Sequence, residues 1–211
     1  MKELAALWLG LTLSAAAHAG AQLEEPLADK VRGALTAAVA DTAPPRPSFD
    51  SIDDRLAYLR WLGATSEKLK KRKSEHAVRV EFLEAVWYES KRAGLEPALV
   101  LGLIQVESGF RKYAISHAGA RGYMQVMPFW SRTIGNGDAA GLFHMQTNLR
   151  FGCVILRHYL DLEKGDLFLA LGRYNGSRGR AEYPTAVFAN RRLWLGGEPA
   201  LAASRATPSG G

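Results

Sequence analysis

Apolar side chains recur at intervals of three and four residues along most of the chain, a spacing that predicts helices rather than strands. One such stripe contains Val78, Phe82 and Val86 and stops at Gly94, so we expect a helix over residues 74–94. The same periodicity predicts further helices over residues 52–62, 147–160, 166–174 and 184–195. No segment alternates apolar and polar residues with a period of two. The pattern therefore predicts a mainly α-helical fold.

One predicted helix is apolar on almost every side. Pro97 suits its first position, and the stretch from Ala98 to Val106 contains a single polar side chain, Gln105. Glu107 ends this helix, just before a helix-stopping Gly109. Burial and the negative end of the helix dipole both disfavour a charged carboxylate, so a buried Glu107 would have a raised pKa and could act as a general acid. The alternative is that its side chain turns outward into water.

The N-terminus has the pattern of an export signal. Lys2 precedes an apolar stretch from Leu4 to Ala17, and the small residues of Ala17-His18-Ala19 form an A-x-A cleavage pattern. The stretch is shorter than the roughly 20 residues of a membrane span, although an uncleaved anchor is the alternative. We therefore expect a signal peptide over residues 1–19 and an exported protein that lies in the periplasm, associated with the cell wall.

The remaining chain divides by composition. We expect a flexible leader rich in Pro and Ala over residues 20–50, a short helical and basic segment over residues 51–73, a catalytic domain over residues 74–195 and a flexible tail over residues 196–211.

Overall composition is that of a soluble globular protein, with 47% hydrophobic and 23% charged residues in 211. It excludes a disordered chain, a collagen-like fibre and a protein that crosses the membrane many times. A single cysteine, Cys153, excludes an internal disulfide, and the histidines lack ligand spacing, so we predict no metal and no cofactor. The formal charge of +6 favours polyanionic partners. Export makes nucleic acid an improbable partner and the bacterial wall a plausible one.

Five positive charges lie within six residues from Lys68 to Lys73. Such a run is commonly a solvated helix face or loop. The alternative is a contact with an anionic wall polymer or, together with the proline-rich leader, with a wall or secretion-machinery partner.

The segment from Ala114 to Pro128 combines small and polar residues. Gly119 and Gly122 predict a tightly turning loop that a ligand can approach closely. Ser116 and Gln125 can donate and accept hydrogen bonds, which suits sugar hydroxyl and acetamido groups.

With these residues in view, the chain resembles the soluble lytic transglycosylase (SLT) domain family over roughly residues 95–190. Four motifs carry the resemblance, in the family's order: Glu107-Ser108-Gly109-Phe110 with Ala114-Ile115-Ser116; Gly119 to Gln125 with Met127-Pro128; Asn148 to Leu156; and Ala170 to Gly176, continuing to Tyr183 and Val187. The chain departs from the family's usual residues at Tyr123, Ile155 and Gly176-Ser177. These departures concern substrate preference rather than chemistry.

The resemblance implies a lysozyme-like helical fold that cleaves peptidoglycan glycan strands without consuming water. One glutamate, at the position of Glu107, would protonate the oxygen between N-acetylmuramic acid and N-acetylglucosamine and then take the proton of the muramyl C6 hydroxyl, so that a 1,6-anhydro ring closes. A hydrolytic glycosidase ordinarily needs two carboxylates. Consistently, no Asp or Glu lies between Glu107 and Asp138.

The resemblance also implies substrate-binding roles for five further residues. Ser116 would bond the substrate near the scissile bond, Gln125 and Met127 would line the cleft, Tyr174 would lie near Glu107, and Asn175 would hold its turn or bind sugar. For Tyr174 and Met127 a place in the core is the alternative, Tyr183 is a lesser candidate, and Trp130 is either a core residue or a platform for a sugar ring.

Two other functions compete with this one. A goose-type lysozyme would use water and need a second acid near the cleft, such as Asp138 or Glu182. A non-catalytic peptidoglycan-binding module would have no use for a buried acid.

Overall fold

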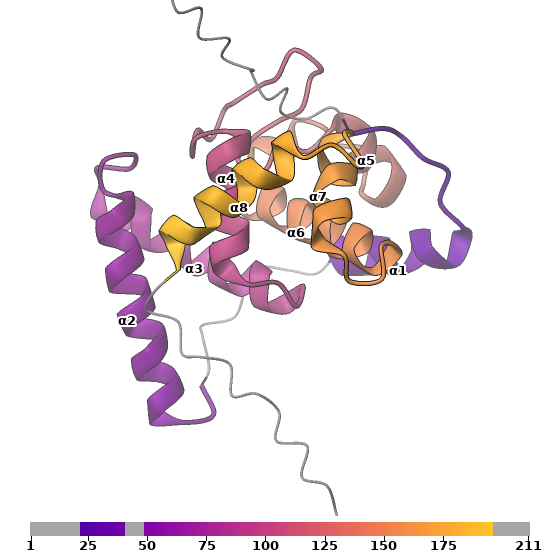
Figure 1. Ribbon diagram of the computed structural model, residues 1–211. Helices are drawn as coiled ribbons and strands as arrows, with labels where there is room; N and C mark the ends of the chain where they lie inside the picture. Colours follow the sequence, from indigo (N-terminus) through magenta and orange to yellow (C-terminus); the bar gives the residue numbers. More distant parts are fainter. Residues whose placement is uncertain (1–21, 41–48, 196–211) are drawn as a thin grey trace, which may run out of the picture.

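A computed structural model describes residues 22–40 and 49–195 (Figure 1). These residues form eight α-helices, one 3-10 helix and no strand beyond isolated bridges at Arg121. The elements are α1 (Asp29–Ala40), α2 (Ile52–Leu69), α3 (His76–Arg92), α4 (Pro97–Glu107), α5 (Pro128–Ile134), η1 (Gly141–Phe143), α6 (Met145–Leu162), α7 (Leu167–Asn175) and α8 (Glu182–Trp194). The predicted mainly α-helical fold is confirmed. The predicted signal peptide and C-terminal tail lie outside the described residues.

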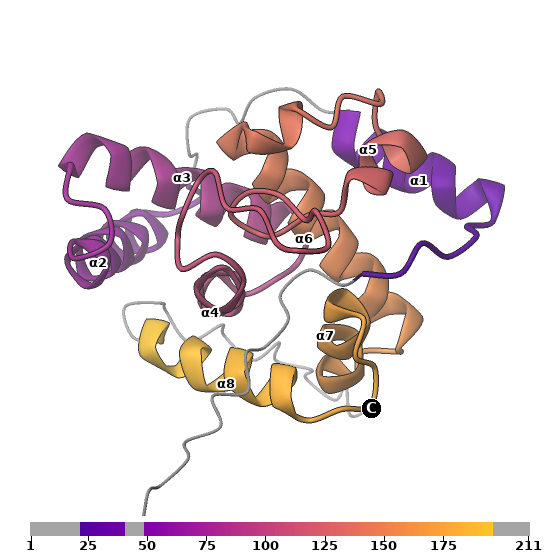
Figure 2. The same ribbon diagram turned by 90° about the horizontal axis from the view of Figure 1, so that it is seen from above.

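Helix α4 lies at the centre of the molecule, packed against α3 on one side and α8 on the other (Figure 2). Leu101, Leu103 and Ile104 are fully buried, as the apolar sequence of this helix predicts. The backbones of α4 and α8 meet at Gly102, where a Cβ atom would lie 2.6 Å from the backbone nitrogen of Arg191. This close crossing brings the end of α4 to the beginning of α8.

Helix α2 is longer than the predicted helix over residues 52–62, because buried positions continue at helical spacing through Trp61, Thr65 and Leu69. It therefore includes the start of the basic run. Lys68 Nζ donates to the carbonyl oxygens of Leu193 and Leu195, at the C-terminal end of α8. No helix among the described residues is both long and apolar enough to cross a membrane.

The end of the basic run is also tied into the fold. Lys73 Nζ donates to the Tyr123 hydroxyl at 2.8 Å and lies over the Tyr123 and Phe82 rings. Lys70 is paired with Glu67, both being exposed, and Arg72 lies over the Phe110 ring. Lys68 and Lys73 thus hydrogen-bond to the rest of the fold, and residues 70–72, in the middle of the run, are exposed, as is Lys68.

Part of the predicted flexible leader is helical. Leu35 and Val39 of α1 are buried and Val31 is partly buried, a spacing of four that places one apolar face of α1 against α6 and α5. The Ala38 carbonyl accepts a hydrogen bond from the Arg92 guanidinium at 2.5 Å. The structure differs here from the expectation because three apolar residues among many alanines were too weak a stripe to predict a packed helix.

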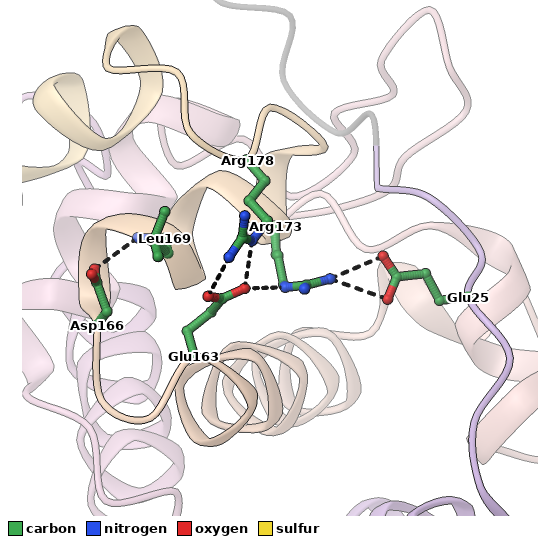
Figure 3. Close-up of polar contacts among 6 residues, drawn as sticks. All are labelled: Glu25, Glu163, Asp166, Leu169, Arg173 and Arg178. Carbon is green, nitrogen blue, oxygen red and sulfur yellow. Dashed lines mark hydrogen bonds and ion pairs between the residues drawn. The ribbon is translucent and has the colours of Figure 1, made fainter.

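An ion-pair cluster joins the N-terminal segment to α7 (Figure 3). Glu163, at the end of α6, accepts from both Arg173 and Arg178, and Arg173 also pairs with Glu25 at 3.1 Å. The bonds from Arg178 and Arg173 lower the pKa of Glu163 to about 2. The cluster thus ties Glu25 of the N-terminal segment to α7 and to the end of α6.

Candidate active site

Glu107 is the last residue of α4, and its side chain points inward. It is 5% exposed. Its Oε1 atom accepts a hydrogen bond from the Tyr183 hydroxyl at 2.5 Å, whereas Oε2 is buried without a hydrogen-bond partner among the described residues. Tyr183 is the second residue of α8 and is itself buried. The prediction that Glu107 is buried is confirmed, and the outward orientation is excluded.

Burial determines the protonation of this carboxyl group. Loss of solvation raises the pKa of Glu107 to about 8, and the hydrogen bond from Tyr183 opposes the rise. A carboxyl group with this pKa is predominantly protonated at neutral pH. It can therefore donate a proton to a leaving oxygen and, once ionised, accept one.

The loop from Ala114 to Pro128 is tied to the end of α4. Ser108, the residue after Glu107, donates its hydroxyl to the Tyr123 carbonyl at 2.7 Å. Gln125 is buried with a backbone φ of +50°, and its amide nitrogen donates to the carbonyls of Ala114 and Gly122 at 3.1 and 2.9 Å. The amide nitrogen that we expected to face the substrate instead holds the loop closed on itself.

Asn148, in the first turn of α6, holds the same loop in place through hydrogen bonds of its side chain. Its side-chain oxygen accepts from the Met124 backbone at 2.8 Å, and its nitrogen donates to the carbonyls of Arg121 and Leu142, both at 2.8 Å. The side chain is fully buried, so all three bonds are formed away from water. The third motif of the sequence thus acts in part by positioning the loop of the second.

Two glycines allow this close packing. At Gly152 of α6, a Cβ atom would lie 2.3 Å from Met124 Sδ and 2.7 Å from Met124 Cβ. Gly122 has a φ of +75°, and a Cβ there would lie 2.5 Å from Asn148 Nδ2. Larger residues at either position would displace the loop that carries Met124 and Gln125.

Ser116 and Met127 lie at the two ends of the loop. Ser116 is partly exposed, and its hydroxyl oxygen accepts from the Ala120 backbone at 3.1 Å, a bond that leaves its hydrogen able to reach a ligand. Met127 immediately precedes α5 and is partly buried against the core. Its contact with the core agrees with the core alternative for Met127, and its place in a substrate cleft stays a prediction.

Tyr174 and Asn175 end helix α7. Tyr174 is fully buried and donates its hydroxyl to the Met124 carbonyl at 2.8 Å, so its place is that of a hydrogen-bonded core tyrosine. It nevertheless lies near the acid: burial raises the pKa of the Tyr174 hydroxyl well above its ordinary value, and the charge of Glu107 adds to the rise. Asn175 donates to Ser177 Oγ at 2.9 Å, and its buried Oδ1 has no hydrogen-bond partner among the described residues.

The structure brings together Glu107, Tyr174 and Tyr183, from the ends of three helices. Ser116, Gln125 and Met127 lie on the loop that is bonded to Ser108 and Tyr174. Sequence reasoning ranked Tyr183 low because its contact depends on the packing of α8 against α4, and it gave Asn148 no role. Their only signal in the sequence was their membership of the third and fourth motifs.

The two acids that a hydrolytic mechanism would recruit are both exposed. Asp138 Oδ1 accepts from the backbone nitrogens of Ala140 and Gly141, which holds its own turn. Glu182 begins α8, next to Tyr183. Within the described part of the chain, burial and Tyr183, rather than a second carboxylate, perturb Glu107.

The model of the Transglycosylase SLT domain family matches residues 84–188. The chain is 38% identical over 87 residues to "Membrane-bound lytic murein transglycosylase C" of Actinobacillus pleuropneumoniae serotype 5b, an alignment that covers 36% of this chain and 23% of that protein. It is 32% identical over 124 residues to "Transglycosylase" of Enterobacteria phage PRD1, covering 56% of this chain and 45% of the phage protein. The chain thus spans less than half the length of these relatives.

Among solved structures, the chain is similar to an inactive mutant of the lytic transglycosylase Slt from Pseudomonas aeruginosa. The sequence identity is 21% and the TM-score is 0.48, over 67% of this chain and 29% of that one.

Proposed function

We propose that the protein is a peptidoglycan lytic transglycosylase, on the premise that residues 84–188 belong to the Transglycosylase SLT domain family. The observation that carries the proposal is the buried Glu107, whose pKa is raised to about 8 at the position of the family's acid. The relatives named as lytic murein transglycosylases support peptidoglycan as the substrate.

Glu107 would act in two steps. In the first, its proton passes to the glycosidic oxygen as the bond between C1 of N-acetylmuramic acid and that oxygen breaks, which leaves the acetylglucosamine with a free hydroxyl. In the second, the Glu107 carboxylate takes the proton of the C6 hydroxyl while O6 bonds to C1. The products are one free hydroxyl end and one 1,6-anhydromuramyl end, and Glu107 is protonated again.

Tyr183 supports the second step. Once Glu107 has lost its proton, the buried carboxylate has one hydrogen bond from the residues that the structure describes, that of the Tyr183 hydroxyl. This bond stabilises the anion and so keeps the pKa from rising further. We therefore assign Tyr183 as the residue that limits the pKa of Glu107, so that the carboxyl group can act first as an acid and then as a base.

The loop and the end of α7 would hold the glycan. Ser116 can donate its hydroxyl hydrogen to a sugar oxygen, and the unpartnered Oδ1 of Asn175 can accept from a sugar hydroxyl or amide. Met127 would pack on a sugar face. Gln125 and Tyr174 act through the loop, because their polar hydrogens are bonded to its carbonyls.

The site of action would be outside the cytoplasm. The signal-like sequence of residues 1–19 supports export, and relatives named as membrane-bound murein enzymes support the periplasm or the wall. The exposed middle of the basic run, residues 70–72, would attract anionic wall polymer. A contact with a wall or secretion-machinery partner through this run or the leader belongs to the same proposal.

The test is digestion of purified peptidoglycan followed by mass spectrometry. Wild-type protein should release sugars lighter by one water than hydrolysis products, and Glu107→Gln should release none. Glu182→Gln is the matched control, because it removes an exposed carboxylate beside Tyr183; it should retain activity. Loss of activity in both variants, with reducing-end products from the wild type, would instead indicate a two-carboxylate hydrolase.

A further inference from the structure

Lys73, the last residue of the basic run, is partly buried, whereas residues 70–72 are exposed. Its Nζ atom lies 5.0 Å from the centroid of the Phe82 ring and 4.6 Å from that of the Tyr123 ring, and it donates to the Tyr123 hydroxyl at 2.8 Å. Partial burial and the nearby charge of Lys112 lower the pKa of Lys73. Removing an ammonium group from water costs free energy, and here the two rings and the hydroxyl offset that cost.

The backbone at Lys73 is held in place by a buried arginine. Arg79 of α3 is 3% exposed, and its Nη1 atom donates to the carbonyl oxygens of Lys73 and Ser74 at 2.8 and 2.5 Å. Its Nε atom donates to Ser66 Oγ of α2 at 3.2 Å. Because the backbone at Lys73 is bonded through Arg79 to both helices, the ammonium group reaches Tyr123 from a fixed position.

Tyr123 lies where the loop from Ala114 to Pro128 meets the end of α4. Its side chain is buried, and its carbonyl oxygen accepts from the hydroxyl of Ser108, the residue after Glu107, at 2.7 Å. The bond from Ser108 holds the backbone of Tyr123, whereas the bond from Lys73 holds the hydroxyl at the other end of the residue. The connection between α2 and α3 is therefore linked through one tyrosine to the end of the helix that carries Glu107.

A hydrogen bond of this kind contributes more to direction than to stability. Both partners of such a bond can be replaced by apolar groups of similar shape with little loss of stability, because the cost of removing them from water disappears with the bond. The rings of Phe82 and Tyr123, whose centroids are 4.8 Å apart, would keep their contact without either polar group. The bond therefore adds a fixed direction for the Tyr123 side chain, and hence for the loop that contains it.

We propose that Lys73 is a positioning residue of the active site: through the Tyr123 hydroxyl it sets the place of the loop on which the proposed sugar contacts Ser116 and Met127 lie. Lys73 does not touch the glycan itself in this arrangement. This inference rests on the proposed function. It makes the end of the basic run a functional part of the site, although the run precedes residues 84–188, which the family model matches.

The competing explanation is that the bond only stabilises the fold. Lys73→Met keeps a long side chain and removes the ammonium group, Tyr123→Phe removes a single oxygen atom, and the double variant removes both partners. Lys91→Met is the matched control, because Lys91 is exposed on α3 and its Nζ atom also lies over an aromatic ring, that of Trp87, at 4.7 Å. If Lys73→Met does not fold, Tyr123→Phe and the double variant still carry the comparison.

Three quantities are measured on the full chain. The dissociation constant of an uncrosslinked glycan-strand fragment is measured by calorimetry in the Glu107→Gln background, where no turnover is expected. Release of anhydro products from the same fragment in the active background gives kcat and KM between pH 5 and 9. Urea unfolding measures the stability of each variant separately from its binding.

Each single variant and the double variant should weaken binding and raise KM about three- to tenfold. The kcat and the alkaline limit of the pH profile should stay unchanged, because the bond between Glu107 and Tyr183 is intact. The double variant should bind no more weakly than the weaker single variant, and its urea midpoint should lie close to that of the wild type. Lys91→Met should match the wild type in binding and in KM.

Wild-type dissociation constants and KM values in the folded double variant would overturn the inference, whatever its stability. So would an equal loss from Lys91→Met, or losses that multiply in the double variant, since Lys73 and Tyr123 would then act independently. A loss confined to kcat, or a shifted pH profile, would place the effect at Glu107 and also overturn it. If the wild type releases no anhydro products, the proposed function fails, while calorimetry still decides whether Lys73 positions a glycan-binding loop.

Discussion

Replacing Glu107, the proposed catalytic acid, should stabilise the protein, increasingly so as the pH rises. The unfolded Glu107 ionises near 4.5, whereas the folded one holds its proton to about 8. Below pH 4.5 the Glu107 carboxyl is protonated in both the folded and the unfolded state, so it adds nothing to the pH dependence of the free energy of unfolding. Between 4.5 and about 8 the unfolded state alone gains from ionisation, so the free energy of unfolding falls. At about 1.36 kcal/mol per pKa unit, the window of about 3.5 units corresponds to on the order of 5 kcal/mol.

Glu107→Gln removes this titration and keeps an oxygen that can accept from Tyr183. Urea unfolding of both proteins at pH 5, 6, 7 and 8 gives the difference in their free energies of unfolding. That difference should rise in favour of the variant by about 1.4 kcal/mol per pH unit and level off near pH 8. Any constant cost of the buried amide hydrogens cancels in the slope. Glu182→Gln controls for the loss of one negative charge, and a flat difference between pH 5 and 8 would refute a raised pKa at Glu107.

Three further changes test the site and the surface. Tyr183→Phe removes the hydrogen bond that lowers the Glu107 pKa, so the alkaline fall of kcat/KM should move above pH 8. At pH 7, kcat/KM should drop about 10- to 100-fold. An unchanged pH profile of kcat/KM would contradict this role of Tyr183. Gly152→Ala should destabilise the fold by about 1–3 kcal/mol in urea, whereas Gly63→Ala, where a Cβ meets nothing, should not; equal stabilities would show that Met124 yields freely. Replacing residues 70–72 with glutamine should weaken pelleting with whole sacculi while cleavage of short glycans stays unchanged, and equal pelleting would exclude a wall contact there.

Local patterns predicted the parts of the site that lie within one element. The apolar run before Glu107 indicates a buried helix, although it left both an inward and an outward orientation of the Glu107 side chain open. The two glycines of the loop, Gly119 and Gly122, predict a close turn, and both have positive φ angles. The basic run from Lys68 to Lys73 illustrates the limit of such patterns. The sequence shows the run of charges, but the hydrogen bonds of Lys68 and Lys73 are made with residues far along the chain, at the end of α8 and at Tyr123.

Contacts between distant elements could not be predicted in this way. Tyr183 reaches Glu107 across 76 residues because α8 crosses α4 at Gly102, and no spacing within either helix contains that information. Gln125 has a residue type suited to sugars, yet its backbone conformation turns the amide nitrogen toward its own loop. Gln22 lies in a segment whose composition predicts flexibility. Its burial follows from bonds to Trp130 and, through Glu25, to Arg173.

The single-acid mechanism is tested most directly by digesting peptidoglycan in water enriched in oxygen-18. If the C6 hydroxyl closes the ring with Glu107 as acid and base, the muramyl ends carry no label and are all 1,6-anhydro, and Glu107→Gln forms none of them. Oxygen-18 at C1 of the muramyl ends would mean that water attacks the bond, and would contradict the proposal that one buried glutamate carries out the reaction alone.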